Sequence, residues 1–281
     1  MDSLNKLTTV AMLSFVISSM LAMGAGLTVL EIASSLQNRR LMISALLANF
    51  VLMPLGALVL AKMLWLDEPL GVGLLLLGCA AGAPFLPKLA ELAVGNLPFA
   101  VGTMVVLMVT TVAYLPIALP LLMPEVTVNP IKIAQSLVLL MLLPLGVGLI
   151  AKAYRADVAG RAKPYLDRFS SVSLLMLILL ISVTNFSKVL QVFGTRGILA
   201  GLLFIALGCC VGWLLGGPGD DTRRVLALGT GQRNIAAALV VGSQSFEDPQ
   251  VTVMVVVVAI AGLVTLMPFA RLLAKRAATA A

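Results

Sequence analysis

The sequence predicts an all-α polytopic membrane protein with about nine transmembrane helices. Hydrophobic residues make up 60% of the 281 residues, charged residues only 11%, and the mean hydropathy is +1.10. A soluble domain averages about 45–50% apolar and about 25% charged residues, so this chain cannot cover a water-facing surface. Its apolar residues form continuous runs of the roughly 20 residues that a bilayer-spanning helix needs. Helices are expected because lipid offers no partners for backbone polar groups, and the continuous runs lack the alternation of a β-barrel.

Turn and charge signals divide the chain into nine expected spans. The first apolar run is taken as a span because no small-residue cleavage pattern follows it. The longest polar gap, residues 151–168, is expected to join the fifth and sixth spans. The spans are residues 8–30, 40–63, 69–94, 97–123, 130–152, 169–193, 195–216, 222–246 and 250–274.

Lysine and arginine residues orient the predicted bundle, because they favour cytoplasmic segments. With the N-terminus outside and the C-terminus inside, the outside segments hold only Lys6, Lys62, Lys132, Lys188 and Arg196. The inside segments then hold Arg39, Arg40, Lys152, Arg155, Arg161, Lys163, Arg168, Arg223, Arg224, Arg271, Lys275 and Arg276. Short termini favour a bacterial inner membrane.

Several functional classes are disfavoured by the residues present. The net charge of +7 lies mostly in short gaps between apolar runs, which indicates membrane topology and not a nucleic-acid partner. Cys79, Cys209 and Cys210 lie in apolar runs without metal or disulfide spacing. The sequence has no histidine, no G-x-S-x-G motif and no acidic pair within the spans, so we expect neither an enzyme nor a bound cofactor.

The third span carries residues that interrupt a helix. It reads GCAAGAPFLPKLAELAVGN, with Gly82, Pro84 and Pro87 in its middle. Proline removes a backbone donor and clashes with the preceding helical turn. Two prolines within four residues therefore predict a break near residues 82–87.

The eighth span carries a second interruption, near residues 229–234. Gly229 and Gly231 precede a polar run, and Asn234 is expected to cap a second half-helix that begins at Ile235. The two interrupted spans are five spans apart, so they cross the bilayer in opposite directions. Such a pair of interrupted helices at matching places in two halves is typical of a transporter site.

Three charges fall within these two spans away from their ends: Lys88, Glu91 and Arg233. A charge at the bilayer centre costs about 2.5–3.5 kcal/mol on insertion scales, so each should face the protein interior. Glu91 lies one turn after Lys88, which predicts an ion pair. Arg233 has no acidic residue within helical reach and lies beside the positive end of the following half-helix, so a functional role is expected for it.

The segments ANFVLMPLGALVLAKML, GLLLLGCAAGAPFLPKLAELAVGN and GTGQRNIAAALVVGS resemble the bile acid:sodium symporter family over essentially the whole chain. The resemblance implies inverted repeats of five helices, with the first helix missing here, and a core of two crossing broken helices packed against a panel. The implied panel comprises residues 8–30 and 130–193. The implied core comprises residues 40–123 and 195–276, with broken helices at 69–94 and 222–246.

The resemblance also implies where sodium would bind, and the residues there depart from the family. Asn234 matches the family's crossover asparagine, and Asn49 matches a glutamine at one sodium site. The remaining family ligands fall on residues without a side-chain oxygen: Leu86, Pro87, Ala100, Met104, Gly229 and Arg233. Sodium is therefore possible but not expected, and a tethered cation can supply the positive charge of a bound ion.

We expect an alternating-access transporter of a small organic anion, because the local cations and the half-helix N-termini favour anions. An arginine suits a carboxylate through two parallel hydrogen bonds. True sodium coupling, proton coupling through Lys88, and a structural or sensor protein remain alternatives. The expected substrate-binding residues are Arg233, Asn234, Gln232, Lys88, Asn49 and Thr230, with Glu91 as charge partner and Gly82, Pro84, Pro87, Gly229 and Gly231 shaping the crossing.

Overall fold

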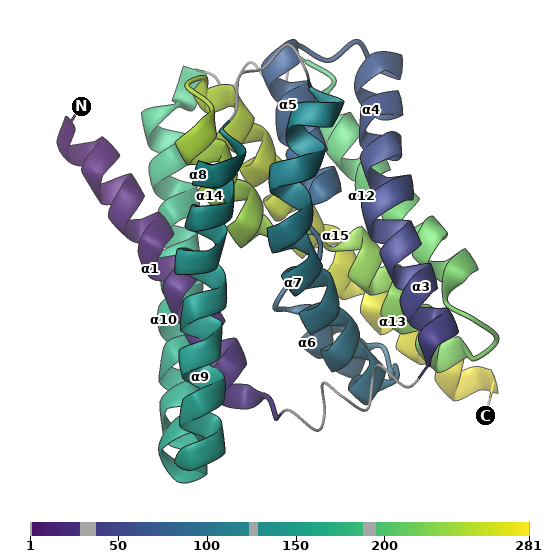
Figure 1. Cartoon of the computed structure of the whole chain (residues 1–281). Helices are drawn as coiled ribbons and strands as arrows, with labels where there is room; N and C mark the ends of the chain where they lie inside the picture. Colours follow the sequence, from purple (N-terminus) through teal and green to yellow (C-terminus); the bar gives the residue numbers. More distant parts are fainter. Residues whose placement is uncertain (1, 29–37, 124–128, 188–194, 281) are drawn as a thin grey trace.

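The protein is an all-helical bundle whose two chain ends lie at opposite ends of the molecule (Figure 1). The computed structural model describes residues 2–28, 38–123, 129–187 and 195–280, and every regular element in these residues is helical. In this part of the chain, eight helices are long and apolar enough to cross a membrane, and an interrupted pair accounts for the ninth expected span. The predicted polytopic fold class is confirmed.

The elements follow the expected spans closely. The first four spans are α1 (Asp2–Gly26), α3 (Arg39–Leu47) with the π-helical turn η1 (Ala48–Leu52) and α4 (Met53–Met63), the pair α5 (Glu68–Cys79) and α6 (Leu86–Leu92), and α7 (Leu97–Leu122). The others are α8 (Pro130–Leu137) with η2 (Val138–Leu142) and α9 (Leu143–Tyr154), α10 (Ala156–Thr184), α12 (Gly197–Leu215), α13 (Asp220–Gly231) with α14 (Ile235–Ser245), and α15 (Pro249–Ala280). The expected span ends at residues 29–30 and 188–193 lie outside the described residues.

The polar gap expected at residues 151–168 is wrong as a connecting segment. α9 continues to Tyr154 and α10 begins at Ala156, so only Arg155 separates the two helices. At 1.5 Å per residue, the 29 residues of α10 span about 44 Å, whereas the hydrocarbon core is about 30 Å thick. Polar residues can therefore occupy the first turns of α10 in a continuous helix. The exposed ion pair of Lys163 with Asp167, at 2.6 Å and i,i+4 spacing, suits such a helix.

The helices form two groups that lie side by side. α1 packs mainly against α9 and α10, and these helices occupy the left of Figure 1. α12 packs against α13 and α15, and α5 packs against α4 and α15, on the other side. The groups meet where α8 and α1 touch α14 and where α10 touches α15. This second group is described below as the crossing group, because it contains both interrupted helices.

The crossing group has the more protected centre. In the most apolar 18-residue stretch of α13 and α14, 89% of the residues are buried, whereas the share in the equivalent stretch of α10 is only 28%. Large apolar side chains are exposed along α10, including Val172, Leu175 and Leu179, as expected for a helix that faces lipid. The polar residues of the eighth expected span, including Arg233 and Asn234, therefore lie in the most buried part of the bundle.

Two glycines allow α1 and α9 to approach closely. A Cβ atom added at Gly148 would lie 2.5 Å from the backbone oxygen of Leu21 and 2.9 Å from the Cα of Gly24. Backbone atoms cannot rotate away as a flexible side chain can. Small residues at this contact let the two helices pack directly, the usual basis of helix association in lipid.

We predict that Gly148→Ala destabilises the protein by about 1–3 kcal/mol, because the added methyl group overpacks a backbone contact. Thermal unfolding in detergent measures this change. Gly146→Ala is the matched control, since nothing lies within 4 Å of the added Cβ two residues earlier on the same helix. Equal melting temperatures for the two variants would contradict the close packing of α1 on α9.

Candidate functional site at the crossing of two interrupted helices

The first interruption lies between α5 and α6. The chain leaves the helix after Cys79, has no regular structure over residues 80–83, and turns through Pro84 before α6 begins at Leu86. Gly82 has a φ of +77°, a conformation that side chains rarely tolerate. An added Cβ there would lie 2.2 Å from the backbone nitrogen of Met108. Gly82 and Pro84 thus shape the break, whereas Pro87 lies inside α6, near its start.

The second interruption is shorter than expected and comprises residues 232–234, between α13 and α14. Asn234 caps α14 as predicted, since its Oδ1 accepts a hydrogen bond from the backbone N–H of Ala237 at 3.1 Å. The break lies within the predicted residues 229–234, but Gly229 and Gly231 themselves are in the last turn of α13. Their small size serves packing instead: an added Cβ at Gly231 would lie 2.5 Å from the Sγ of Cys209.

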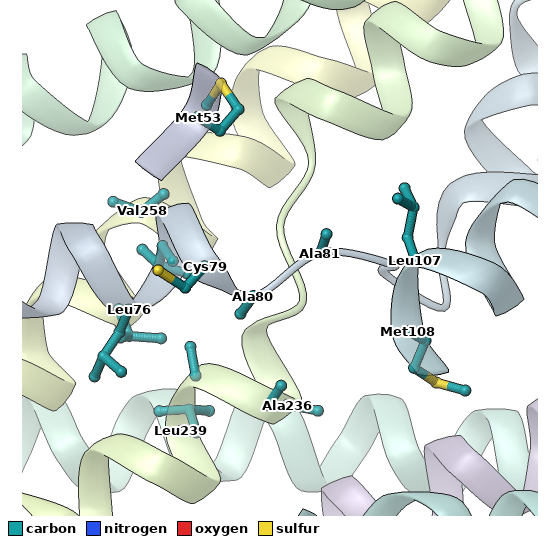
Figure 2. Packing of buried hydrophobic residues seen from close by; sticks show 14 of the residues in the cluster. Met53, Leu76, Cys79, Ala80, Ala81, Leu107, Met108, Ala236, Leu239 and Val258 are labelled. Carbon is teal, nitrogen blue, oxygen red and sulfur yellow. The ribbon is translucent and has the colours of Figure 1, made fainter. Parts of the chain in front are cut away.

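The two interruptions cross in direct contact. The backbone N–H of Asn234 donates to the carbonyl oxygen of Ala80 at 3.0 Å. Its Nδ2 donates to the carbonyl oxygens of Ala81 and Gly82 at 3.3 and 3.0 Å. Figure 2 shows the extended segment at Ala80 and Ala81 beside the second interruption, within packed apolar side chains. Because the segments lie about 150 residues apart in the chain, this one asparagine joins the two halves of the crossing group.

Arg233 satisfies the carbonyl groups that the broken helices leave open. Its Nε donates to the carbonyl oxygen of Leu77 at 2.8 Å, and its Nη2 donates to that of Gly78 at 2.7 Å, both in the last turn of α5. Its Nη1 donates to the carbonyl oxygen of Thr230 at 3.3 Å, in the last turn of α13. The guanidinium therefore lies at the carboxyl ends of two half-helices, where a positive charge is stabilised.

The guanidinium of Arg233 is enclosed and fully bonded. Its remaining two N–H groups donate to Asn49, at 2.6 Å to Oδ1 and 3.5 Å to the backbone oxygen. All five N–H groups therefore have protein partners, and the residue is only 2% exposed. The bidentate contact to a substrate carboxylate expected from the sequence would require some of these bonds to break.

A π-helical turn positions Asn49. Asn49 lies in η1, which ends two residues before Pro54. Because proline has no N–H, the carbonyl group four residues before Pro54 lacks its α-helical donor. That carbonyl belongs to Phe50, and it accepts a hydrogen bond from the hydroxyl of Tyr114 at 2.7 Å. The Nδ2 of Asn49 donates to Thr230 Oγ1 at 3.2 Å. Asn49 thus links α3–η1–α4 to the crossing.

The structure brings together four of the six expected substrate-binding residues. Arg233, Asn49 and Thr230 form one hydrogen-bonded network, Asn234 follows Arg233 in the chain and binds the first interruption, and all four are nearly or fully buried. Gln232 adjoins them in the second interruption and is partly exposed. Its Oε1 atom is buried without a hydrogen-bond partner, so Gln232 is the network's neighbour with a free polar atom.

Lys88 and Glu91 do not join this network. The predicted ion pair is present, with Nζ and Oε2 at 2.8 Å. However, the two side chains are 57% and 61% exposed, so the expectation that they face the interior is wrong. Hydropathy places α6 within the bilayer, but the direction of a side chain on such a short helix depends on its neighbours.

One threonine of α7, Thr111, belongs to the site although it was not among the expected site residues. The Oγ1 of Thr111 accepts from the N–H of Ala81 at 2.9 Å and donates to the carbonyl oxygen of Ala81 at 3.1 Å. Thr111 thereby holds the first interruption from the side opposite the helix ends. Threonine is common in apolar helices, so the sequence carries no specific signal for this role.

Hydrocarbon fills the positions where the resemblance implied sodium ligands. The side chain of Leu86 covers Gly229, since an added Cβ at Gly229 would lie 2.9 Å from its Cδ2 atom. Ala100 and Met104 are buried as well. No group of three or more His, Cys, Asp or Glu side chains that could hold a metal occurs in the described part of the chain. The positive charge at the crossing is the guanidinium itself.

The chain is similar in sequence to proteins of one transporter family. The model of the Sodium Bile acid symporter family matches residues 13–192. The chain is similar to the probable sodium/metabolite cotransporter BASS1, chloroplastic, of Arabidopsis thaliana, with 24% identity over 82% of this chain and 58% of that protein. It is also similar to BASS2 of Oryza sativa subsp. japonica, with 25% identity over 83% of this chain and 57% of that protein. The chain thus spans less than three fifths of these relatives, and the family model covers more than half of it. We conclude that the chain belongs to the sodium bile acid symporter family.

Proposed function

We propose that the protein is a secondary transporter that moves a small organic anion by alternating access. The observation that carries this proposal is the crossing itself, in which two interrupted helices meet around a buried cation. Irregular backbone at membrane depth is tolerated where it is enclosed by protein or lines a path, and it forms the substrate sites of many transporters. In the proposed mechanism, α1, α8, α9 and α10 form the panel, and the crossing group moves against it as the core.

We further propose that transport is independent of sodium. Two features support this proposal at the two implied ion positions. At one position, Leu86 packs on Gly229, where an oxygen ligand would be needed. At the other, the guanidinium of Arg233 occupies the space between Asn49 and the carbonyl oxygen of Thr230. In this proposal, the guanidinium of Arg233 stabilises the carboxyl ends of α5 and α13 in place of a bound ion.

The anion is proposed to bind at the edge of the crossing. Arg233 contributes its charge, while its N–H groups hold the helix ends and Asn49. Gln232 is partly exposed and its side-chain amide carries N–H donors, so this amide is the proposed direct contact. Asn234, Asn49 and Thr230 keep the surrounding backbone in place. Lys88, exposed on α6, is a further candidate for attracting the anion.

Sodium coupling is the second candidate function. It is favoured by the printed names of the relatives, which describe those proteins as probable sodium/metabolite cotransporters. In that case, sodium would have to bind through backbone carbonyl groups, because the side chains at the implied positions lack the oxygen atoms.

The proposed orientation places the N-terminus outside and the C-terminus in the cytoplasm. It is supported by the excess of Lys and Arg in the segments that are then inside.

We predict that uptake of the transported anion into proteoliposomes is the same, within about twofold, in sodium and in choline buffers. The physical reason is that the positive charge at the crossing is covalently attached and cannot be exchanged. A panel of small carboxylates and sulfonates, each measured in both buffers, tests this. Uptake that occurs only with a sodium gradient would show that the second candidate function is correct.

We predict that Arg233→Gln lowers stability by more than about 3 kcal/mol, because an amide cannot donate to all the buried carbonyl groups that the guanidinium serves. Thermal unfolding in detergent gives the result. Arg233→Lys should be intermediate, since it retains the charge but has fewer donors. Arg196→Gln is the control: Arg196 also donates to a backbone carbonyl, that of Leu64, but from an exposed position. Unfolding of Arg233→Gln at the unmodified protein's temperature would contradict the bracing role.

We predict that Lys88→Ala changes stability by less than about 1 kcal/mol, because an exposed ion pair contributes little. The same unfolding assay measures it, with Glu91→Ala as the matched change on the other partner. A loss as large as that of Arg233→Gln would mean that Lys88 braces the crossing after all.

A further inference from the structure

A polar pocket of about 480 Å³ lies between the two helix groups, away from the crossing. Its walls come from α8 and η2 on one side and from the last turn of α14 on the other. Gln244 lies ten residues after Asn234, so the pocket is about 15 Å along α14 from the crossing. The lining residues of α14 are at its last turn, near the end of the bundle where α5 and α15 begin (Figure 1).

The two walls of the pocket are joined by a side-chain hydrogen bond. The Oγ of Ser136 on α8 donates to the Oε1 of Gln244 on α14. One residue earlier on α14, the Oγ of Ser243 contacts the Sδ of Met12 on α1 at 3.2 Å. The last turn of α14 therefore contacts both α8 and α1. The pocket lies where these groups must separate if one moves against the other.

The chemistry of the lining suits an anion. Lys132 supplies an ammonium group, Gln135 and Gln244 supply amide donors, and Ser136 and Ser245 supply hydroxyl groups. Leu139 and Leu140 add apolar surface, so the lining is mixed. None of the described residues that line the pocket carries a carboxylate, so this part of the lining has one net positive charge. One cation among neutral donors fits a single carboxylate or sulfonate on a hydroxylated carbon skeleton better than a cation or an apolar solute.

We infer that this pocket is an anion-selective entry site, at which Lys132 captures a small carboxylate or sulfonate before it reaches the crossing. The inference rests on the proposed transport function, because a capture site at the boundary of two moving groups has a use only if the solute then passes between them. The Ser136–Gln244 bond joins the two walls of the pocket and must break if the walls separate to let the anion proceed.

Charged thiol reagents test this inference without knowledge of the substrate. Ser245→Cys places a thiol in the pocket, in a Cys210→Ser background that removes an exposed native thiol. We compare labelling rates for a methanethiosulfonate that carries a sulfonate and for one that carries a trimethylammonium group. The background protein without the Ser245→Cys change corrects for reaction at Cys79 and Cys209.

The expected result is that Lys132→Gln lowers the anionic-to-cationic rate ratio by about fivefold, the effect of removing one charge several ångströms away in water. Lys62→Gln is the matched control, because Lys62 is an exposed cation in the last turn of α4 at the same end of the bundle but outside the pocket. The control should leave the ratio unchanged within about twofold. An unchanged ratio in Lys132→Gln, an equal change in the control, or no labelling by either reagent would overturn the inference.

The labelling assay is independent of transport, so the two proposals can fail separately. If no anion is taken up but the ratio depends on Lys132, the transport proposal fails and the anion selectivity of the pocket stands. If an anion is taken up but the ratio is indifferent to Lys132, the transport proposal stands and the entry site is wrong.

Discussion

The structure depends on how the carbonyl groups of two helices that end inside the bundle are satisfied. A helix leaves its last four carbonyl groups without intrahelical partners, and an unsatisfied polar group at this depth costs several kcal/mol. α5 and α13 both end at the crossing, so their costs would add at one place. Arg233 supplies donors to both ends, and Asn234 supplies donors to the extended segment between them. Burying a guanidinium costs free energy by itself. Here its hydrogen bonds offset the cost of leaving carbonyl groups unsatisfied at the ends of both α5 and α13.

Other features of the bundle serve this same network. Arg233 needs acceptors for five donors, and the two helix ends supply only three of them. Asn49 supplies the other two, and it does so from a π-helical turn that Pro54 favours. The proline in turn frees the carbonyl group of Phe50, which Tyr114 satisfies. One polar side chain in a membrane helix therefore requires a chain of further polar partners, and these partners fix how α3–η1–α4 and α7 pack on the crossing.

The sequence predicted the bundle better than the site. Span positions followed from runs of apolar residues, and the breaks from Gly82, Pro84 and the cap at Asn234, because these signals act locally along the chain. The start of α10 was missed because polar residues past the hydrocarbon region remain helical without a hydropathy signal. The exposure of Lys88 was missed because hydropathy indicates how deep a residue lies in the membrane but not which way its side chain points. The bonds of Arg233 could not be predicted, since most of its acceptors are backbone oxygens, which every residue type carries.

A fixed cation at the crossing has consequences for how sodium coupling could be gained or lost. A bound ion leaves its site in each cycle and so links transport to its own gradient, whereas a guanidinium on Arg233 stays in place and supplies no such link. Restoring the ion positions is difficult by single changes. Any side chain added at Gly229 meets Leu86, and replacing Arg233 alone leaves the helix ends unsatisfied before any ion ligand exists. Leu86, Gly229 and Arg233 must therefore change together. In the proposed sodium-independent mechanism, this mutual dependence is a physical reason for the crossing to persist while the side-chain ligands at the implied positions are absent.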